Sequence, residues 1–238
     1  MHAKPHLHSS ISIPHLSEIP PHQQINPVPI FLTNIILTSF VIPTFENLNH
    51  HKMKKFLRGN EMDRIPNWAF KTMAFMFNVT DIFKSPNRKL DPFNIQKGQT
   101  VIDYGSGTGR YLPKASELVG EQGLVYAVDI HELAIRAAIL LIEKQRLKNV
   151  KTILTNGKSV NIPSHKADII YALDMFHMVK NSQLFLKELK RLAKSDGILY
   201  LEDGHQPRLE TKEKVLKSGC WEIIEETKTF IKCTPKTI

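Results

Sequence analysis

The stretch most suited to ligand chemistry runs from Thr100 to Gly109 and reads TVIDYGSGTG. The apolar pair Val101-Ile102 leads to Asp103, and glycines follow at 105, 107 and 109. An apolar run that ends in closely spaced glycines predicts a buried strand, a tight turn and then a helix. Such a turn brings backbone N–H groups and a helix N-terminus close to a ligand, and Asp103 adds a carboxylate at the strand end. We therefore predict a ligand-binding turn in this stretch.

Two ligand classes use glycine turns of this kind. The dinucleotide fingerprint G-x-G-x-x-G/A needs a small third residue so that the helix packs on the strand. Counted from Gly105, that position is Arg110, whose long charged side chain argues against a dinucleotide. The spacing G-x-G-x-G, with an acid two places ahead, instead resembles the first motif of the class I S-adenosylmethionine-dependent methyltransferases. The resemblance covers about residues 62–235 and implies S-adenosyl-L-methionine as the cofactor.

The elements that must position this turn alternate regularly along the chain. Apolar runs predict strands at 101–104, 124–129, 150–154, 167–173 and 198–201, and helical spacing predicts helices at 111–119, 132–147 and 184–193. Strands separated by helices predict a parallel sheet with helices on both faces. The late segments 221–224 and 228–231 indicate an antiparallel hairpin at the sheet edge. This α/β pattern matches a Rossmann-like class I methyltransferase fold with a mostly parallel seven-stranded sheet.

Ligands of open α/β sheets bind beyond the carboxyl ends of the strands, and this rule selects residues independently of the resemblance. Asp129 ends the second strand and is placed to accept hydrogen bonds from two ribose hydroxyls. The third strand leads into Asn156-Gly157-Lys158, which is similar to a family segment whose acid reads the adenine amino group. Because Lys158 stands at the acid's place, we expect adenine contacts from backbone groups or from the Asn156 side chain. The resemblance implies this cofactor set: Asp103, Tyr104, Gly105, Ser106, Gly107, Gly109, Asp129, Ile130, Asn156, Gly157, Lys158 and Leu173.

Polar residues that follow the fourth and fifth strands are candidates for proton transfer. The stretch LDMFHMV contains Asp174 and His177, and EDGH contains Asp203 and His205. A histidine with a pKa near about 6.5 beside a carboxylate can act as a general base on an acidic hydroxyl, amine or carbon. The alternative is that these four residues only shape the pocket. The first stretch resembles the small-molecule branch of the family, which includes the ubiquinone/menaquinone C-methyltransferase-like group.

Two other site types find no support in these stretches. The Asn/Asp-Pro-Pro-Tyr/Phe motif, with which DNA amino-methylating enzymes bind a flipped base, does not follow the fourth strand. No clustered set of acids, as in metal-dependent catechol-type enzymes, can be assembled. We therefore predict no metal site.

Residues 1–52 differ in composition from the rest of the chain. They hold half of the chain's 14 prolines and no glycine, which predicts a disordered or weakly ordered extension. Met53 is a candidate translation start, and a membrane-docking tail is the alternative. The apolar run 30–42 is shorter than the about 20 residues that cross a bilayer, so no integral membrane segment is predicted.

The remaining chain divides into two predicted parts. Residues 53–98 include a segment rich in aromatic residues and methionine at 67–83, which predicts a helical lid segment. This segment either packs on the sheet edge or covers the cofactor. Residues 99–238 form the predicted S-adenosylmethionine-binding domain.

Composition narrows the partners. The formal charge is +9, but basic residues alternate with acids along the predicted helices, so a solvated surface is favoured over nucleic-acid binding. Two cysteines form no disulfide framework, which fits a reducing cytoplasm. The sequence thus predicts a methyltransferase acting on a small molecule and leaves the oligomeric state open. An RNA or protein methyltransferase and a non-catalytic cofactor-binding module are the alternatives, and a nicotinamide oxidoreductase is the weakest.

Overall fold

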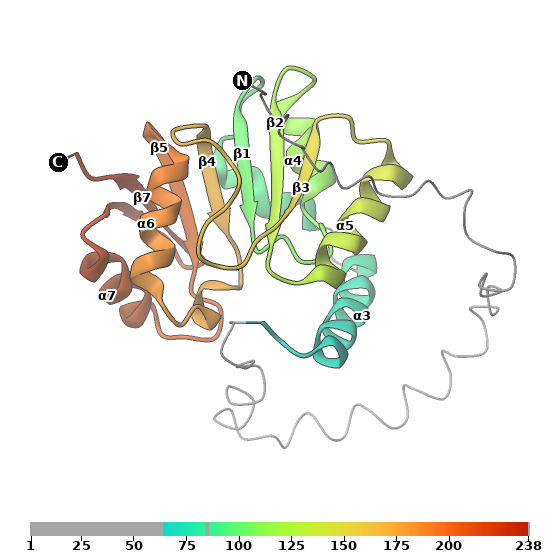
Figure 1. Ribbon diagram of the computed structural model, residues 1–238, viewed down its shortest axis with the longest axis horizontal. Coiled ribbons are helices and arrows are strands. Elements are labelled where there is room, and N and C mark those ends of the chain that lie inside the picture. The colour runs from blue at the N-terminus through green and yellow to red at the C-terminus, as the bar shows by residue number, and fades with distance from the viewer. Residues whose placement is uncertain (1–63, 84–85, 238) are drawn as a thin grey trace, which may run out of the picture. The chain divides into compact units, whose positions relative to one another are not determined.

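The structure is a computed structural model that describes residues 64–83 and 86–237 (Figure 1). The predicted extension at 1–52 and the candidate start at Met53 lie outside these residues. The elements are α3 (Asn67–Phe83), η3 (Pro86–Phe93), β1 (Thr100–Tyr104), α4 (Leu112–Val119), β2 (Leu124–Asp129), α5 (Glu132–Gln145), β3 (Val150–Leu154), β4 (Ala167–Ala172), η4 (Phe176–Met178), α6 (Ser182–Leu192), β5 (Ala193–Glu202), α7 (Arg208–Ser218), β6 (Trp221–Glu226) and β7 (Phe230–Pro235).

The strands form one seven-stranded sheet in the order β3-β2-β1-β4-β5-β7-β6. The first five strands are parallel, and β7 runs antiparallel to both β5 and β6. The predicted mostly parallel sheet with an antiparallel hairpin is therefore confirmed. The chain passes from β1 to β2 on one side and later returns to place β4 on the other. The strand order reverses between β1 and β4, which is where open α/β sheets bind their ligands.

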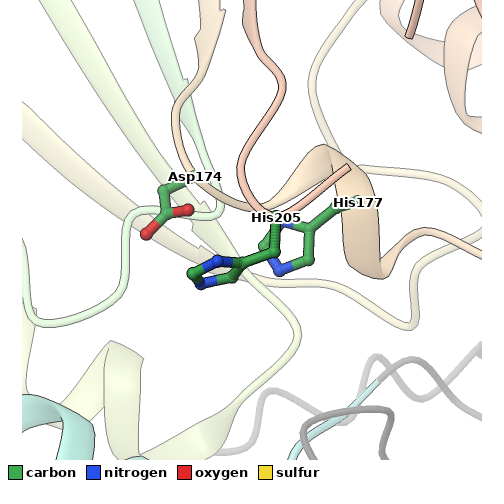
Figure 2. A group of neighbouring side chains, drawn as sticks. All are labelled: Asp174, His177 and His205. Atoms are coloured by element: carbon green, nitrogen blue, oxygen red, sulfur yellow. The ribbon is translucent and has the colours of Figure 1, made fainter. Parts of the chain in front are cut away.

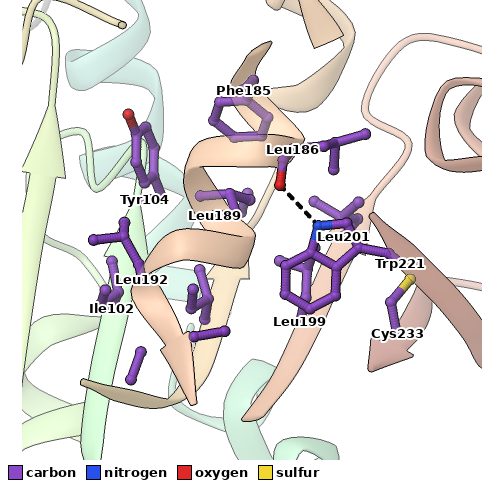
Figure 3. Close-up of a cluster of buried hydrophobic side chains, with 14 of the residues drawn as sticks. Ile102, Tyr104, Phe185, Leu186, Leu189, Leu192, Leu199, Leu201, Trp221 and Cys233 are labelled. Atoms are coloured by element: carbon purple, nitrogen blue, oxygen red, sulfur yellow. Dashed lines mark hydrogen bonds between the residues drawn. The ribbon is translucent and has the colours of Figure 1, made fainter. Parts of the chain in front are cut away.

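Alternation along the strands sends neighbouring side chains to opposite faces, and each face carries its own core. Ile102 of β1 belongs to a cluster covered by α6 and α7, with Leu186 and Leu189 fully buried (Figure 3). Val101, one residue earlier, belongs to the opposite cluster, which is covered by α4, α5 and η3. Both faces are thus closed, and the carboxyl edge of the sheet is left for ligand binding.

Two element boundaries differ from the sequence expectation. The strand expected at 198–201 is ten residues long and begins at Ala193, directly after α6. Its first part pairs with the start of β4, because Ala193 lies opposite Ala167 across a register shift. Polar residues such as Asp196 hide this part of the strand from a pattern of apolar alternation. The hairpin is also less simple than expected, since β7 lies between β5 and β6 and only β6 is at the edge.

Among residues 64–83 and 86–237, no helix combines the length and the apolar character needed to cross a membrane. Both cysteines are free: Cys233 lies buried in β7, and Cys220 is partly buried just ahead of β6. Burial raises the pKa of the Cys233 thiol to about 12.

The two tryptophans offer a matched test of the core. Trp221 is fully buried, and its indole Nε1–H donates to the Leu186 carbonyl at 2.9 Å (Figure 3). We expect Trp221→Phe to lower the free energy of unfolding by about 2–3 kcal/mol, because the Leu186 carbonyl loses its donor and a cavity forms. Urea denaturation measures this change. The control is Trp68→Phe on α3, where the side chain is 51% exposed and the expected change is below about 0.5 kcal/mol. Equal losses in the two variants would contradict this account of the core.

Candidate active site

The glycine turn after β1 is held against β2 by its own backbone. Gly105 N–H and Ser106 N–H both donate to the Val128 carbonyl, at 2.7 and 3.1 Å. Gly109 N–H donates to the Ser106 carbonyl at 2.9 Å. The expectation that this turn presents its N–H groups to a ligand therefore does not hold for these three, since each has an acceptor within the protein. The turn provides space for a ligand instead.

Gly105 and Gly107 explain that space. Both have positive φ, 81° and 54°, a region that side chains rarely tolerate. A Cβ on Gly105 would lie 2.7 Å from Cγ of Met175, in the loop after β4. A side chain at this position would therefore displace Met175. A Cβ on Gly107 would meet no atom within 4 Å, so this part of the turn faces open space.

Asp129 at the end of β2 is fixed by two backbone donors. Its Oδ2 accepts from Gly107 N–H at 2.9 Å, and its Oδ1 accepts from His131 N–H at 2.8 Å. Burial raises the pKa of the Asp129 carboxyl, and the backbone hydrogen bonds oppose that shift. The carboxylate thus links the glycine turn to the start of α5, and its remaining lone pairs can accept from a ligand hydroxyl.

A cavity of about 500 Å³ opens at the carboxyl ends of β1, β2, β4 and β5. Its volume lies within the range of small-molecule sites. Ten of the sixteen predicted site residues line it: Tyr104, Gly105, Ser106, Gly107, Asp129, Ile130, Gly157, Leu173, Asp174 and Asp203. Six do not: Asp103, Gly109, Asn156, Lys158, His177 and His205. The rule that ligands bind at strand ends therefore predicted the edge of the sheet where the cavity lies and ten of the residues that line it.

Asp103 lies behind the turn and is only 2% exposed. Burial raises the pKa of its carboxyl to about 8; the neighbouring Tyr171 hydroxyl opposes the shift, and the Asp129 charge adds to it. The residue is therefore protonated at neutral pH. It does not line the cavity, so the carboxylate expected to meet a ligand at this strand end is not available there.

In the loop after β3, a polar side chain hydrogen-bonds to the backbone of the same loop. Asn156 Oδ1 accepts from the backbone N–H groups of Lys158 and Ser159, at 2.9 and 3.3 Å. The Asn156 and Lys158 side chains are exposed outside the cavity wall. This turn leaves Gly157 (φ 78°) at the cavity beside Ile130. At the cavity, this loop therefore contributes the Gly157 backbone and not the Asn156 or Lys158 side chains.

The four candidate proton-transfer residues have different surroundings. Asp203 receives Arg208 Nε on both carboxylate oxygens, at 2.9 and 2.8 Å, so it holds the start of α7 in place. Asp174 lines the cavity with φ of 52°. His177 and His205 lie edge to face with ring centroids 4.9 Å apart, just beyond the cavity wall (Figure 2).

The cavity wall includes two charged residues that the sequence analysis did not select. Lys89 of η3 forms an ion pair with Glu202 at the end of β5, and both line the cavity. Burial raises the pKa of the Glu202 carboxyl, and the Lys89 contact lowers it. Glu202 directly precedes the predicted Asp203, so its position at a strand end was a usable signal. Lys89 lies far from every motif, and only the fold brings it to the cavity.

The helix α3 covers part of the cavity. Ile65, Phe70 and Met73 line the wall, and Phe70 stacks on the His131 ring with centroids 4.4 Å apart. His131 Nδ1 accepts from Leu133 N–H, and burial lowers the pKa of the imidazole. A neutral histidine presents a suitable face for an aromatic ring. The segment ahead of β1 therefore packs on the start of α5 and also supplies an apolar wall.

Gly105→Ala tests whether ligand binding requires a residue without a side chain at this position. Gly98 has nearly the same φ, 82° against 81°, but a Cβ there would meet nothing within 4 Å. Both alanine variants should lose about 1–2 kcal/mol of stability through backbone strain. Only Gly105→Ala displaces Met175, so only this variant should also weaken ligand binding, by about tenfold, because the cavity wall shifts. Calorimetric titration of both variants with S-adenosylhomocysteine measures the difference. Equal affinities would refute the role of Gly105.

Comparison with known proteins agrees with this geometry. Residues 95–235 match a family described as a methyltransferase domain. The ubiquinone/menaquinone biosynthesis C-methyltransferase of Yersinia enterocolitica is 29% identical over 136 residues, which are 57% of this chain and 54% of that protein. A demethylmenaquinone methyltransferase of Geobacillus stearothermophilus is 29% identical over 116 residues, 49% of this chain and 50% of that protein. The chain thus matches about half the length of these relatives.

A solved structure extends the similarity to most of the described chain. The crystal structure of an S-adenosylmethionine-dependent methyltransferase from Aquifex aeolicus superposes with a TM-score of 0.56 at 26% identity. The alignment covers 79% of this chain and 98% of that one. The chain therefore belongs to the methyltransferase domain family and has the Rossmann-like fold of the class I S-adenosylmethionine-dependent methyltransferases.

Proposed function

We propose that this protein transfers a methyl group from S-adenosylmethionine to a small organic acceptor. The observation that carries the proposal is the cavity at the strand-order reversal, which has two different walls. One wall is the glycine turn with Asp129, and the other is formed by α3 and the loops after β4 and β5. One cavity thus offers a polar anchor for a cofactor and a separate wall for an acceptor.

The cofactor fits the first wall on chemical grounds. Asp129 is a fixed acceptor for ribose hydroxyls, since its two backbone donors hold the carboxylate in place. Gly107 and Gly157 leave backbone surfaces that an adenosyl group can approach, and Ile130 lies beside Gly157 as an apolar contact for the base. We assign the adenosine half to this region.

The acceptor fits the second wall, where apolar and aromatic side chains predominate. Met175, Met178 and Val179 of the loop after β4 line the cavity together with Phe70 and Met73 of α3. The relatives in Yersinia enterocolitica and Geobacillus stearothermophilus are named for ubiquinone and menaquinone biosynthesis and for demethylmenaquinone. By analogy we propose a flat aromatic or quinol-type acceptor.

The residues contribute to methyl transfer mainly by position and by excluding water. When bound, the cofactor would supply a methyl group attached to a positively charged sulfur, and this charge is lost when the methyl group leaves. An apolar wall favours loss of charge, and a fixed cavity holds the acceptor in line with the methyl carbon. No side chain of the chain has to form a covalent bond.

Binding and turnover test the proposal in two steps. Isothermal titration calorimetry of the folded chain should show one site for S-adenosylmethionine and for S-adenosylhomocysteine. Radiolabelled methyl groups should then appear on a member of a panel of quinols, phenols and small amines. Folded protein that binds neither cofactor form would refute the proposal. Binding without transfer to any acceptor of a broad panel would favour a cofactor-binding module.

The cellular setting is part of the same proposal. We place the protein in the cytoplasm, because its two free thiols suit a reducing compartment. Nucleic acid is not among the proposed acceptors.

A further inference from the structure

Two loops beside the cavity bring three metal-binding side chains together. Asp174 and His177 follow β4, and His205 follows β5. Each of the three offers one ligand atom, and these atoms all lie within 4.8 Å of one another (Figure 2). In the picture the His205 ring lies between the Asp174 carboxylate and the His177 ring. The site therefore joins residues that are far apart in sequence.

Two residues of these loops have uncommon backbone conformations. Asp174 has a φ of 52°, which is uncommon for a residue other than glycine. Gly204 has a φ of 59°, and a Cβ there would overlap Nδ1 of His177. Only a glycine beside His205 lets the two loops approach so closely. Asp174 and His205 are exposed, and His177 is partly buried where Gly204 lets the two loops approach.

Two imidazoles and a carboxylate are a ligand set for first-row transition metals. Zinc binds histidine nitrogen and carboxylate oxygen at about 2.0–2.2 Å, so its ligand atoms lie about 3–4 Å apart. The observed limit of 4.8 Å is wider than this spacing, so the side chains would have to move closer together to bind an ion. Three protein ligands leave a coordination position open for water or a substrate.

Charged groups of both signs lie around the cluster. Lys89 and Arg110 act on Asp174 electrostatically, and both oppose a bound cation. Lys89 is engaged by Glu202, which returns a negative charge to the same wall. Arg110 lies over the Tyr111 ring, 5.3 Å from its centroid. A cation bound here would therefore meet charges of both signs.

We propose that Asp174, His177 and His205 bind one divalent transition-metal ion, of the zinc or ferrous-iron type, at the acceptor end of the cavity. Asp174 and Gly204 line the cavity and both histidines adjoin them, so a metal ion held by the three side chains would lie at the cavity wall within reach of an acceptor. This position takes an oxygen of the acceptor, which selects acceptors with a hydroxyl or carbonyl group. The role toward the acceptor rests on the proposed function, but metal binding does not.

Cobalt titration of the full-length chain tests the site directly. After removal of metal by a chelator, Co²⁺ should bind and produce visible ligand-field bands typical of nitrogen and oxygen ligands. His177→Ala and His205→Ala should each weaken this binding by at least about 100-fold, because loss of a ligand costs more than loss of its supporting contacts. Asp174→Asn is a third variant with little change in shape, so it keeps the test valid if a histidine variant unfolds.

The control is a histidine outside the cluster. The seven histidines within residues 1–51 are present in every variant, so any Co²⁺ that they bind is common to all titrations. His165→Ala removes a histidine whose Nδ1 lies 3.1 Å from the Ala193 carbonyl, at the opposite edge of the sheet. This variant should keep the Co²⁺ bands and the affinity. Unchanged affinity in the Asp174, His177 and His205 variants would overturn the proposal, as would equal loss in His165→Ala.

The two proposals fail in different ways. S-adenosylhomocysteine binding by metal-free protein reports on the cofactor wall alone, and Co²⁺ spectra without cofactor report on the metal site alone. Cofactor binding with no Co²⁺ site would overturn only the metal proposal. Co²⁺ binding without any cofactor binding would remove only the assigned role toward the acceptor.

Discussion

Asp129→Asn is expected to weaken S-adenosylmethionine binding by about 100-fold. The carboxylate is the acceptor that joins Gly107 N–H to His131 N–H, and its free lone pairs are the proposed ribose contact. An asparagine keeps the shape but directs an NH₂ group toward one of these donors. Hydrogen bonds to charged groups contribute about 1.5–3 kcal/mol each, so loss of one or two corresponds to this drop in affinity.

Asp168→Asn is the matched control for this experiment. Asp168 Oδ2 also accepts a backbone N–H, from Thr100 at 2.7 Å, and its Oδ1 pairs with Lys194. It lies at the start of β4, at the edge of the sheet opposite the cavity. Calorimetric titration should show cofactor affinity near that of the wild type in this variant. If both variants lost affinity equally, the effect would come from the fold and not from a contact with the cofactor.

Asp103→Asn is expected to stabilise the protein at neutral pH. Burial raises the pKa of this carboxyl from 3.8 to about 8, so the folded protein holds a proton that the unfolded chain releases. Between these pH values the contribution of Asp103 to stability falls as the pH rises, by about 1.4 kcal/mol per pH unit. At pH 7 the accumulated cost is about 4 kcal/mol, which a neutral asparagine avoids.

Urea denaturation of the variant and the wild type at pH 5, 6, 7 and 8 measures this effect. The difference in the free energy of unfolding should grow with pH, because unfolding of the wild type releases the Asp103 proton and the asparagine has no such proton to release. Subtracting one curve from the other removes the contributions of the other carboxyl groups, which both proteins share. A difference that stays constant over this range would show that Asp103 is already ionised in the folded state.

The glycine turn shows which structural features local sequence patterns can predict. Val101-Ile102 followed by three alternate glycines predicts a strand, a tight turn and a helix, because conformational limits act over a few residues. The strand-end rule then placed Asp129, Leu173 and Asp174 at one edge, and the structure brings all three to the cavity. The class of fold and the location of the cavity follow from such local patterns.

The hydrogen-bond partners of these same residues required the tertiary structure. The amides of Gly105 and Ser106 reach Val128, and Asp203 is held by Arg208, although sequence suggested ligand-facing roles for them. A pattern specifies where a donor lies along the chain but not which acceptor comes within hydrogen-bonding distance. That choice depends on packing between distant segments.

The sequence by itself determined the class of fold, the glycine turn and the edge of the sheet at which the cavity lies. These depend on alternation, helical spacing and backbone conformation, all of which are local properties. Only the tertiary structure decided that Lys89 pairs with Glu202 and that His177 and His205 meet beside Asp174. Such contacts join loops after different strands, and their geometry is set by the register of β4 on β5.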